Sequence, residues 1–304
     1  MTIEVKPVSG YDDLERWVEI RNEAAPDDPE TVEMMALVRA RELHRMDLLA
    51  FLDGEPAGAA FLAGDPASVA STHPYVDIRV REELRGRGVG TALVTALAEG
   101  ARAQGKLGFE CSVLASDAHS LGYVERRGYE EIRRVDKWTL DLTGEVPLHE
   151  PPSGIEITWL AERPDLMNAM YDVATATYPE FGGWIGRQAD TIQDWLVYEL
   201  GNPAMPVELT SVAVAGDGEV AGFSTFIRLP DGRTASHRMV AVAHAWRRRG
   251  IARALVSAQL HGAKGAGYES MVAWRRGGAT PDRAFTRLGF QRGHSWIVFV
   301  GPLP

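Results

Sequence analysis

The sequence predicts a mixed α+β fold that is built twice along the chain. Three short segments of the first half recur in the second half in the same order, at intervals of 161 to 164 residues. Self-similarity over so long a period indicates two copies of a whole domain rather than a solenoid of small units. The repeated segments are DGEPAG (53–58) with DGEVAG (217–222), RGRGVGTALV (85–94) with RRRGIARALV (247–256), and ERRGY (125–129) with TRLGF (286–290).

Each copy has the same predicted order of elements. A short strand precedes a helical segment, and a hairpin follows that turns on Asp53-Gly54 or Asp217-Gly218, a strong signal for a tight hairpin turn. A further strand leads into the glycine-rich stretch, which opens an Ala/Leu-rich helix. A strand, a short helix that ends at a Gly-aromatic pair and a last strand complete the copy. Because strands dominate early and helices are interspersed, we expect a layered α+β architecture. The predicted strands and helical segments are 3–5, 12–24, 48–63, 75–80, 109–114 and 137–142 in the first half, and 155–157, 164–176, 211–227, 237–242, 269–274 and 296–300 in the second.

The boundary between the copies is predicted at TGEVPLHEPPSG, residues 143–154. This segment contains three prolines and two glycines and has no periodic apolar pattern, which is typical of a linker. We therefore expect an N-terminal domain at 1–142 and a C-terminal domain at 155–304.

The bulk composition limits the class of protein. The net charge of −10 disfavours general binding to nucleic acid or to an anionic membrane, and it favours solubility or a cationic partner. The sequence has no apolar run near the ~20 residues of a membrane span and no signal-peptide pattern at its start. Cys111 is the single cysteine, so the chain cannot form an internal disulfide. We expect a cytoplasmic location.

The glycine-rich stretch predicts a binding site for a pyrophosphate. Glycines allow a tight turn and let a ligand approach the backbone, and the first N–H groups of the following helix attract anions. Arginines add positive charge at the same place in both copies. They are Arg85, Arg87, Arg247, Arg248 and Arg249.

Two other phosphate-binding motifs do not fit. A dinucleotide-binding fingerprint reads Gly-x-Gly-x-x-Gly in the first strand–helix turn of a domain, whereas here Gly86, Gly88 and Gly90 follow a hairpin and are spaced as Gly-x-Gly-x-Gly. A Walker loop would end in Gly-Lys-Ser/Thr, and that ending is missing from both copies.

The order of motifs resembles the GCN5-related N-acetyltransferases, a family with the motif Gln/Arg-x-x-Gly-x-Gly/Ala after its fourth strand. Residues 85–90 satisfy this motif, and residues 247–252 satisfy it in the form that ends in alanine. The family's downstream Gly-aromatic pair corresponds to Gly128-Tyr129 and Gly289-Phe290. The resemblance covers nearly the whole chain, and the layout is similar to that of mycothiol synthase-type tandem acetyltransferases.

This resemblance implies the fold and the cofactor. Each domain would hold a central, mostly antiparallel sheet whose fourth and fifth strands splay apart, flanked by helices. Acetyl-CoA would place its pyrophosphate on the helix-entry amides and its pantetheine arm along the preceding strand. The implied cofactor-binding residues are Ile78, Val80, Arg85, Gly86, Arg87, Gly88, Val89, Gly90, Thr91, Asp117 and Ser120 in the first half, and Val240, Val242, Arg247, Arg248, Arg249, Gly250, Ile251, Ala252 and Arg253 in the second.

The catalytic residues are less clearly indicated. The family's usual acid, a tyrosine four residues before the Gly-aromatic pair, is replaced by Val124 and Phe285. Tyr123 lies one position away and is either a substitute acid or a core aromatic. The usual base is a glutamate on the fourth strand, where Pro74 and Ser236 stand.

The nearest titratable groups on that strand are Asp77 and His237. Asp77 is either the general base or a salt-bridge partner of Arg79 or Arg81. His237 is either a base or a surface residue. A bulge in the strand would make the facing of these side chains unpredictable, and proton removal through water would leave no single essential base.

The predicted function is an acetyl-CoA-dependent N-acetyltransferase. It would act on a primary amine of a small molecule or peptide by direct attack in a ternary complex. The alternative is a non-catalytic acyl-CoA-binding sensor or scaffold, which the missing tyrosines favour. Gly90, Asp117, Ser120 and Tyr123 favour the first half for cofactor binding, although both halves stay open. The acceptor and the oligomeric state cannot be read from the sequence.

Overall fold

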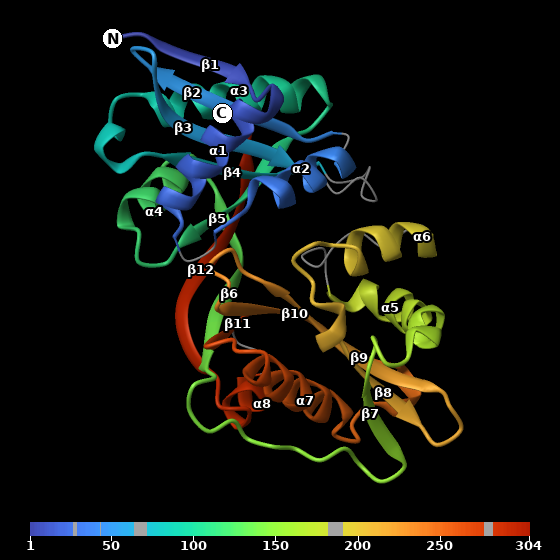
Figure 1. Cartoon of the computed structure of the whole chain (residues 1–304). Coiled ribbons are helices and arrows are strands. Elements are labelled where there is room, and N and C mark those ends of the chain that lie inside the picture. Colours follow the sequence, from blue (N-terminus) through green and yellow to red (C-terminus); the bar gives the residue numbers. More distant parts are fainter. Residues whose placement is uncertain (27–28, 43, 64–71, 182–190, 277–281) are drawn as a thin grey trace. The chain divides into compact units, whose positions relative to one another are not determined.

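The helices and strands of the computed structural model divide into two compact units. Unit 1 comprises Met1–Val135 and Ser295–Pro304, and unit 2 comprises Asp136–His294. The structure describes residues 1–26, 29–42, 44–63, 72–181, 191–276 and 282–304 (Figure 1).

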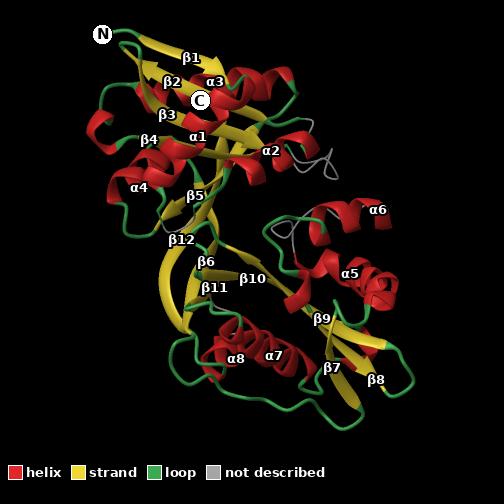
Figure 2. Cartoon of the chain, viewed as in Figure 1, coloured by secondary structure: helices red, strands yellow, loops and turns green. Residues whose placement is uncertain are grey.

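Unit 1 is a sheet of order β1-β2-β3-β4-β5-β12 with helices on both faces (Figure 2). Neighbouring strands pair antiparallel except β4 and β5, which are parallel. The strands are β1 (Ile3–Pro7), β2 (Met46–Leu52), β3 (Glu55–Ala63), β4 (Tyr75–Val80), β5 (Gly108–Leu114) and the part of β12 (Gln291–Pro302) from Ser295 onward. The helices are α1 (Gly10–Ala24), α2 (Val32–Arg41), α3 (Val89–Ala103) and α4 (Ala118–Glu125).

Each face of this sheet packs on the apolar side of its helices. Leu93 and Leu97 of α3 are fully buried against β2 and β3, four residues apart as one face of a helix requires. Trp17 of α1 is fully buried on the opposite face, and its indole N–H donates to the Ala60 carbonyl at 3.1 Å. The Ala/Leu-rich composition of 89–103 therefore serves helix formation and core packing together.

Unit 2 repeats this plan with the order β6-β11-β10-β9-β8-β7. The pairs β7–β8, β8–β9 and β9–β10 are antiparallel, and β10–β11 is parallel. Its strands are the part of β6 (Glu130–Asp141) from Asp136 onward, β7 (Ile155–Trp159), β8 (Ser211–Ala215), β9 (Val220–Arg228), β10 (Thr234–Val242) and β11 (Ser270–Arg276). Its helices are α5 (Met167–Phe181), α6 (Ile192–Trp195), a π-helical turn at Leu196–Leu200, α7 (Ile251–Gly265) and α8 (Asp282–Arg287).

The predicted fold class is confirmed. Both units are mixed α/β layers, and their sheets are mostly antiparallel. In each unit the single parallel pair among these strands is the fourth with the fifth. The predicted hairpin on Asp53-Gly54 is also present: both residues have positive φ, 51° and 90°, as a type I′ turn requires.

The compact units do not coincide with the halves of the sequence repeat. The last strand of the first half, β6, contributes its residues from Asp136 to unit 2, and β12 contributes its residues from Ser295 to unit 1. The predicted boundaries 1–142 and 155–304 describe the repeat along the chain, and the units differ from them by an exchange of last strands. The reason is that β6 and β12 are equivalent strands, so either can complete either sheet.

Two glycines of the repeated hairpin motif permit close backbone approach at the fourth strand. A Cβ on Gly222 would lie 2.5 Å from the Ala241 carbonyl oxygen, and one on Gly58 would lie 3.0 Å from the Arg79 carbonyl oxygen. The motif thus retains glycine where any side chain would push the neighbouring strand away.

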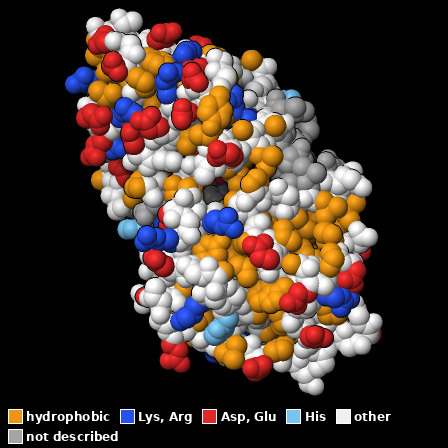
Figure 3. All heavy atoms as spheres, viewed as in Figure 1, with side chains coloured by type: hydrophobic (Ala, Val, Ile, Leu, Met, Phe, Trp, Pro, Cys, Tyr) orange, Lys and Arg blue, Asp and Glu red, His pale blue; other side chains and the backbone are white. Residues whose placement is uncertain are grey.

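No described helix is long and apolar enough to cross a membrane. On the face drawn in Figure 3, acidic and basic side chains are interspersed rather than segregated by sign. The excess of acidic residues therefore does not gather into one patch on that face.

Candidate functional site

The two glycine-rich stretches fold into the same turn. After β4 and after β10, a short 3₁₀ turn leads to an arginine whose Nε donates to the carbonyl of the strand's last residue. The distance is 3.2 Å from Arg85 to Val80 and 3.0 Å from Arg247 to Val242. Gly88 and Gly250 then precede the helices with φ near +88°. This left-handed conformation favours glycine and explains why both copies keep it.

One position of the turn differs between the two units. Gly86 has a φ of 74°, and its counterpart Arg248 has a φ of 62°. A non-glycine residue in the left-handed region is strained, and such strain collects at functional sites. The strained backbone places an arginine in the turn of unit 2 where unit 1 has a glycine.

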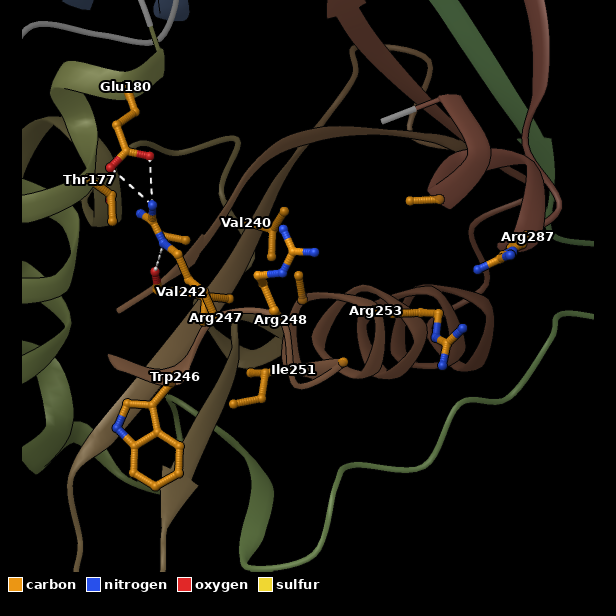
Figure 4. A pocket seen from close by; sticks show the side chains of 14 residues that line it. Thr177, Glu180, Val240, Val242, Trp246, Arg247, Arg248, Ile251, Arg253 and Arg287 are labelled. Carbon is orange, nitrogen blue, oxygen red and sulfur yellow. Dashed lines mark hydrogen bonds and ion pairs between the residues drawn. The ribbon is translucent and has the colours of Figure 1, made fainter. Parts of the chain in front are cut away.

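A cavity of about 560 Å³ lies at the start of α7 in unit 2 (Figure 4). Its walls come from the end of β10, the turn that follows, the first turn of α7, and two residues each of α5 and α8. The lining residues are Thr177, Glu180, Val240, Ala241, Val242, Trp246, Arg247, Arg248, Gly250, Ile251, Ala252, Arg253, Ala284 and Arg287. Eight of the nine cofactor-binding residues predicted for the second half are among them. The ninth, Arg249, instead places its guanidinium 4.7 Å from the ring centre of Trp246.

The cavity is positively charged. Four arginines line it, against the single carboxylate of Glu180. Glu180 accepts from Arg247 at 2.8 and 3.1 Å and lies 2.7 Å from His244 Nε2. Within the described residues, Arg248, Arg253 and Arg287 form no ion pair. Helix-entry N–H groups have no intrahelical partner, so the start of α7 adds donors beside these cations. The arrangement suits a ligand with several negative charges.

The fourth and fifth strands splay apart in both units. Strands β10 and β11 pair from Thr234↔Ser270 to His237↔Ala273 and then separate. Strands β4 and β5 pair only at Tyr75↔Glu110. The backbone of β10 beyond His237 is therefore free of β11 where the strand reaches the cavity wall at Val240 and Val242.

Strand β10 contains a bulge that β4 lacks. The pairing of β10 with β9 skips Arg238, whereas β4 pairs with β3 without a break over its described length. The consequence is visible in the side chains: Arg238 and its neighbour Met239 both face the α5 side, toward Glu199 and the core that includes Trp195. The extra residue also moves the alignment of the two halves by one position before the bulge. In the structure, Ser236 is therefore the counterpart of Tyr75 and not of Pro74.

His237 faces the α7 side and does not line the cavity. Its Nδ1 lies 3.1 Å from Oε1 of Gln259 in α7, and its ring contacts Phe285 at 6.1 Å between centroids. Burial lowers its pKa to about 4, an effect that the Gln259 hydrogen bond opposes and that Arg275 reinforces. The imidazole is therefore neutral at pH 7 and is a packed polar residue rather than a surface residue.

Asp77 lies in an ion-pair network on the α1 side of unit 1. Its carboxylate binds Arg21 of α1 and lies 2.9 Å from Nε of Arg79. Burial alone would raise its pKa, but Arg79 and Arg21 hold the pKa at about 2. Arg21 also binds Glu30 at 2.8 Å. Of the two roles that the sequence left open for Asp77, this geometry favours the salt bridge, because a carboxylate of such low pKa is a weak base.

The Asp77→Asn substitution is expected to destabilise unit 1 by about 3–5 kcal/mol, because it leaves Arg21 buried with too little negative charge. Urea denaturation at pH 7 measures this loss. The dependence of stability on pH also follows from this network. The pKa of Asp77 in the folded protein is below the value of about 3.9 for an unfolded carboxyl. The contribution of Asp77 to the free energy of unfolding is therefore complete above pH ~4 and is lost as the pH falls through about 2.

Glu131→Gln, which breaks an exposed pair with Arg134, is the control and should change the free energy of unfolding by less than about 1 kcal/mol. Equal effects of both substitutions would contradict this assignment.

Three further predicted residues of unit 1, Asp117, Ser120 and Tyr123, lie in or beside α4. Asp117 caps this helix: its carboxylate accepts from the Ser120 N–H at 3.1 Å and from the Ser120 hydroxyl at 2.6 Å. Burial raises the pKa of Asp117, but these hydrogen bonds and the nearby Arg85 lower it overall. Asp117 thus lies near Arg85 of the glycine-rich turn of unit 1. The cofactor-binding role of Asp117 and Ser120 stays a prediction, and the described cavity lies in unit 2.

Tyr123 is partly buried and packs against a core cluster of unit 1. Its ring lies 3.6 Å from the guanidinium carbon of Arg127, beside the cluster of Val113, Val124 and Phe299. Burial raises the pKa of its hydroxyl. Asp77 and Tyr123 belong to unit 1 and His237 to unit 2, so no single unit contains the three predicted catalytic residues.

Sequence reasoning missed several residues of the cavity wall, notably Glu180 and Arg287. Glu180 is near the end of α5, far from the glycine-rich stretch, and nothing in its local pattern marks it. Arg287 stands in the repeated segment TRLGF, where only the Gly-aromatic pair was interpreted. Its place two residues after Phe285, the residue that stands at the family's tyrosine position, is the signal that could have found it.

Comparison with known proteins agrees with this geometry. A sequence profile of the Acetyltransferase (GNAT) family matches residues 14–129 and 167–290. A search of curated proteins finds no significant match.

Solved structures similar over the whole chain include a GCN5-related N-acetyltransferase from Sphaerobacter thermophilus, with 21% identity, a TM-score of 0.75 and coverage of 99% of this chain and 96% of that one. A tandem GNAT protein from the clavulanic acid biosynthesis pathway has 17% identity and a TM-score of 0.78, with coverage of 100% and 99%. A GNAT-family acetyltransferase from Colwellia psychrerythraea has 12% identity and a TM-score of 0.66, with coverage of 98% and 99%. At identities of 12–21%, the likeness to these structures is evidence for the fold alone.

Proposed function

Because the chain belongs to the acetyltransferase (GNAT) family, whose members generally use acetyl-CoA, we propose that it is an acetyl-CoA-dependent N-acetyltransferase. We place its cofactor site in unit 2. The acceptor is a primary amine of a small molecule or peptide. The observation that carries this proposal is the arginine-lined cavity at the start of α7.

Unit 2 is suited to hold the diphosphate of acetyl-CoA. The first-turn N–H groups at Ile251 and Ala252 and the guanidinium groups of Arg247 and Arg248 border one cavity. Backbone donors and the helix dipole bind phosphate without a dedicated lysine. Glu180 and the Val242 carbonyl fix the position of Arg247 before any ligand arrives.

The pantetheine arm would run along β10. Beyond His237 this strand has lost β11 as its neighbour, so its backbone N–H and C=O groups can pair with an extended amide chain. Val240 and Val242, predicted from the resemblance, line the cavity at this point. In unit 1 the corresponding Ile78 and Val80 lie on a strand without the bulge.

Acetyl transfer requires few side chains. The amine nitrogen attacks the thioester carbonyl, the C–S bond breaks, and the thiolate of CoA takes up a proton. The bulge at Arg238 leaves backbone groups outside the β9 ladder, where an N–H can stabilise the developing oxyanion. The proton of the amine leaves through water in this proposal, because His237 does not line the cavity and Phe285 has no hydroxyl.

The alternative function is a non-catalytic acyl-CoA sensor. Buried Phe285, at the position where the resemblance implies a catalytic tyrosine, favours it. Calorimetry of the intact protein with acetyl-CoA tests the proposed site, and release of free thiol with a panel of amines tests the reaction. We expect binding, and turnover with at least one amine. Lack of binding would refute both functions, whereas binding without turnover over the whole panel would favour the sensor.

A further inference from the structure

The cavity of unit 2 holds more positive charge than a diphosphate requires. Arg247 is already neutralised by Glu180, and Arg248 lies in the phosphate turn itself. Arg253 and Arg287 are two further cations, from two other elements, and neither has a carboxylate partner within the described residues. In a chain of net charge −10, uncompensated arginines that converge on one cavity indicate a second anionic group on the ligand.

Arg253 and Arg287 lie on the side of the cavity away from Glu180. Arg253 is the third residue of α7, and Arg287 is the last residue of α8. Figure 4 shows both guanidinium groups at the α8 side, while Arg247 extends to Glu180 at the opposite side. The two arginines thus form a place for an anion that is separate from the turn at Arg247 and Arg248.

Unit 1 lacks this pair. The counterpart of Arg253 in the repeat is Thr91, and that of Arg287 is Arg126. Arg126 folds back on its own helix, since its Nη1 would lie 2.9 Å from a Cβ placed on Gly122. Two arginines at these positions are therefore a property of the second half and not a requirement of the fold.

We propose that Arg253 and Arg287 bind the 3′-phosphate of coenzyme A and make unit 2 selective for free acyl-CoA. This inference rests on the proposed function. A phosphate monoester carries nearly two negative charges at pH 7 and accepts the parallel N–H donors of a guanidinium. Dephospho-CoA lacks this group, and so does the phosphopantetheine of an acyl carrier protein. The two arginines thereby favour free acyl-CoA over acyl groups that are delivered on a carrier protein.

The test compares acetyl-CoA with acetyl-3′-dephospho-CoA by calorimetry on the full-length protein. We expect the unmodified protein to prefer acetyl-CoA by about tenfold or more. Arg253→Gln and Arg287→Gln should each weaken acetyl-CoA binding by about tenfold and leave the affinity for the dephospho compound within about twofold. Arg283→Gln is the matched control, because Arg283 is exposed on the same short helix as Arg287 and does not line the cavity.

Two results would overturn the inference. One is equal affinity of the unmodified protein for the two compounds. The other is a loss in the variants that is the same for both compounds, which would mean that the arginines act on a shared part of the ligand. If neither compound binds, the proposed function fails as well, so the two failures are distinguishable.

Discussion

Deletion of residues 295–304 is expected to unfold unit 1, although these residues end the second half of the repeat. They supply the strand that lies beside β5, with seven residue pairs from Trp296↔Leu114 to Pro302↔Gly108. Strand β5 has little other support, because it pairs with β4 only at Tyr75↔Glu110. Ile297, Val298 and Phe299 are at most 6% exposed, so their loss opens the core around Val113 and Val124.

The loss of free energy should be comparable to the whole stability of an ordinary domain. Removing three buried apolar side chains costs about 2–5 kcal/mol each, against a total of about 5–15 kcal/mol for a typical domain. Hydrogen-exchange mass spectrometry resolves the two units: peptides of β2 to β4 should lose protection, and peptides of β8 to β10 should keep it. Val298→Asp should reproduce much of this effect, and Gln291→Asp, at the exposed start of the same strand, should not. Unchanged protection of β2 to β4 in the deletion variant would show that β12 does not complete unit 1.

This exchange of strands marks the limit of what the sequence could predict. The order of the strands and the helices after the glycine-rich turns follow from local turn chemistry and periodicity, and the structure agrees with them. Helices α2 and α6 were not predicted separately from α1 and α5, and the second hairpin has a positive φ at Gly218 but not at Asp217. The partner of a last strand cannot be predicted in this way, because β6 and β12 each follow a Gly-aromatic pair and each contain an apolar segment, KWTLDL and WIVFV. Neither segment carries a local signal for the strand beside which it lies.

The residues of the candidate site likewise divide into those that the sequence could predict and those that it could not. That the turn 247–253 borders a candidate site could be predicted, because glycine, arginine and a helix start stand there in consecutive residues. A bulge in the fourth strand was considered from the resemblance, but its position at Arg238 and its absence from the described length of β4 could not be predicted, since one additional residue only shifts the apparent alternation of β10. Its effect is large: it turns His237 toward Gln259 on the α7 side and brings Arg238 to Glu199 on the other. Glu180 was missed because it reaches the cavity from α5 through tertiary contact alone.

The assignment of the cofactor to unit 2 leads to the second large effect. The Ala252→Glu substitution is expected to abolish measurable acetyl-CoA binding, whereas Gly90→Glu, the same change at the counterpart position, should have little effect. Ala252 lines the cavity in the first turn of α7. A carboxylate there would face the diphosphate and occupy the N–H groups that would otherwise bind it. Charge repulsion together with the lost hydrogen bonds should reduce affinity by a factor of about 100 or more.

Both substitutions are compatible with the fold, which makes the comparison informative. A glutamate in the first turn of a helix is favoured by the helix dipole, so neither variant should lose stability. Ala252 is exposed, and a Cβ on Gly90 would meet only Val80 Cγ2 at 3.7 Å, an ordinary contact. Thermal unfolding checks this expectation before calorimetry is performed. Intact binding in Ala252→Glu together with lost binding in Gly90→Glu would move the cofactor to unit 1, where Gly90, Asp117 and Ser120 originally favoured it. Partial loss in both variants would mean that each unit binds one molecule, because the calorimetric stoichiometry would then fall from two toward one in either variant.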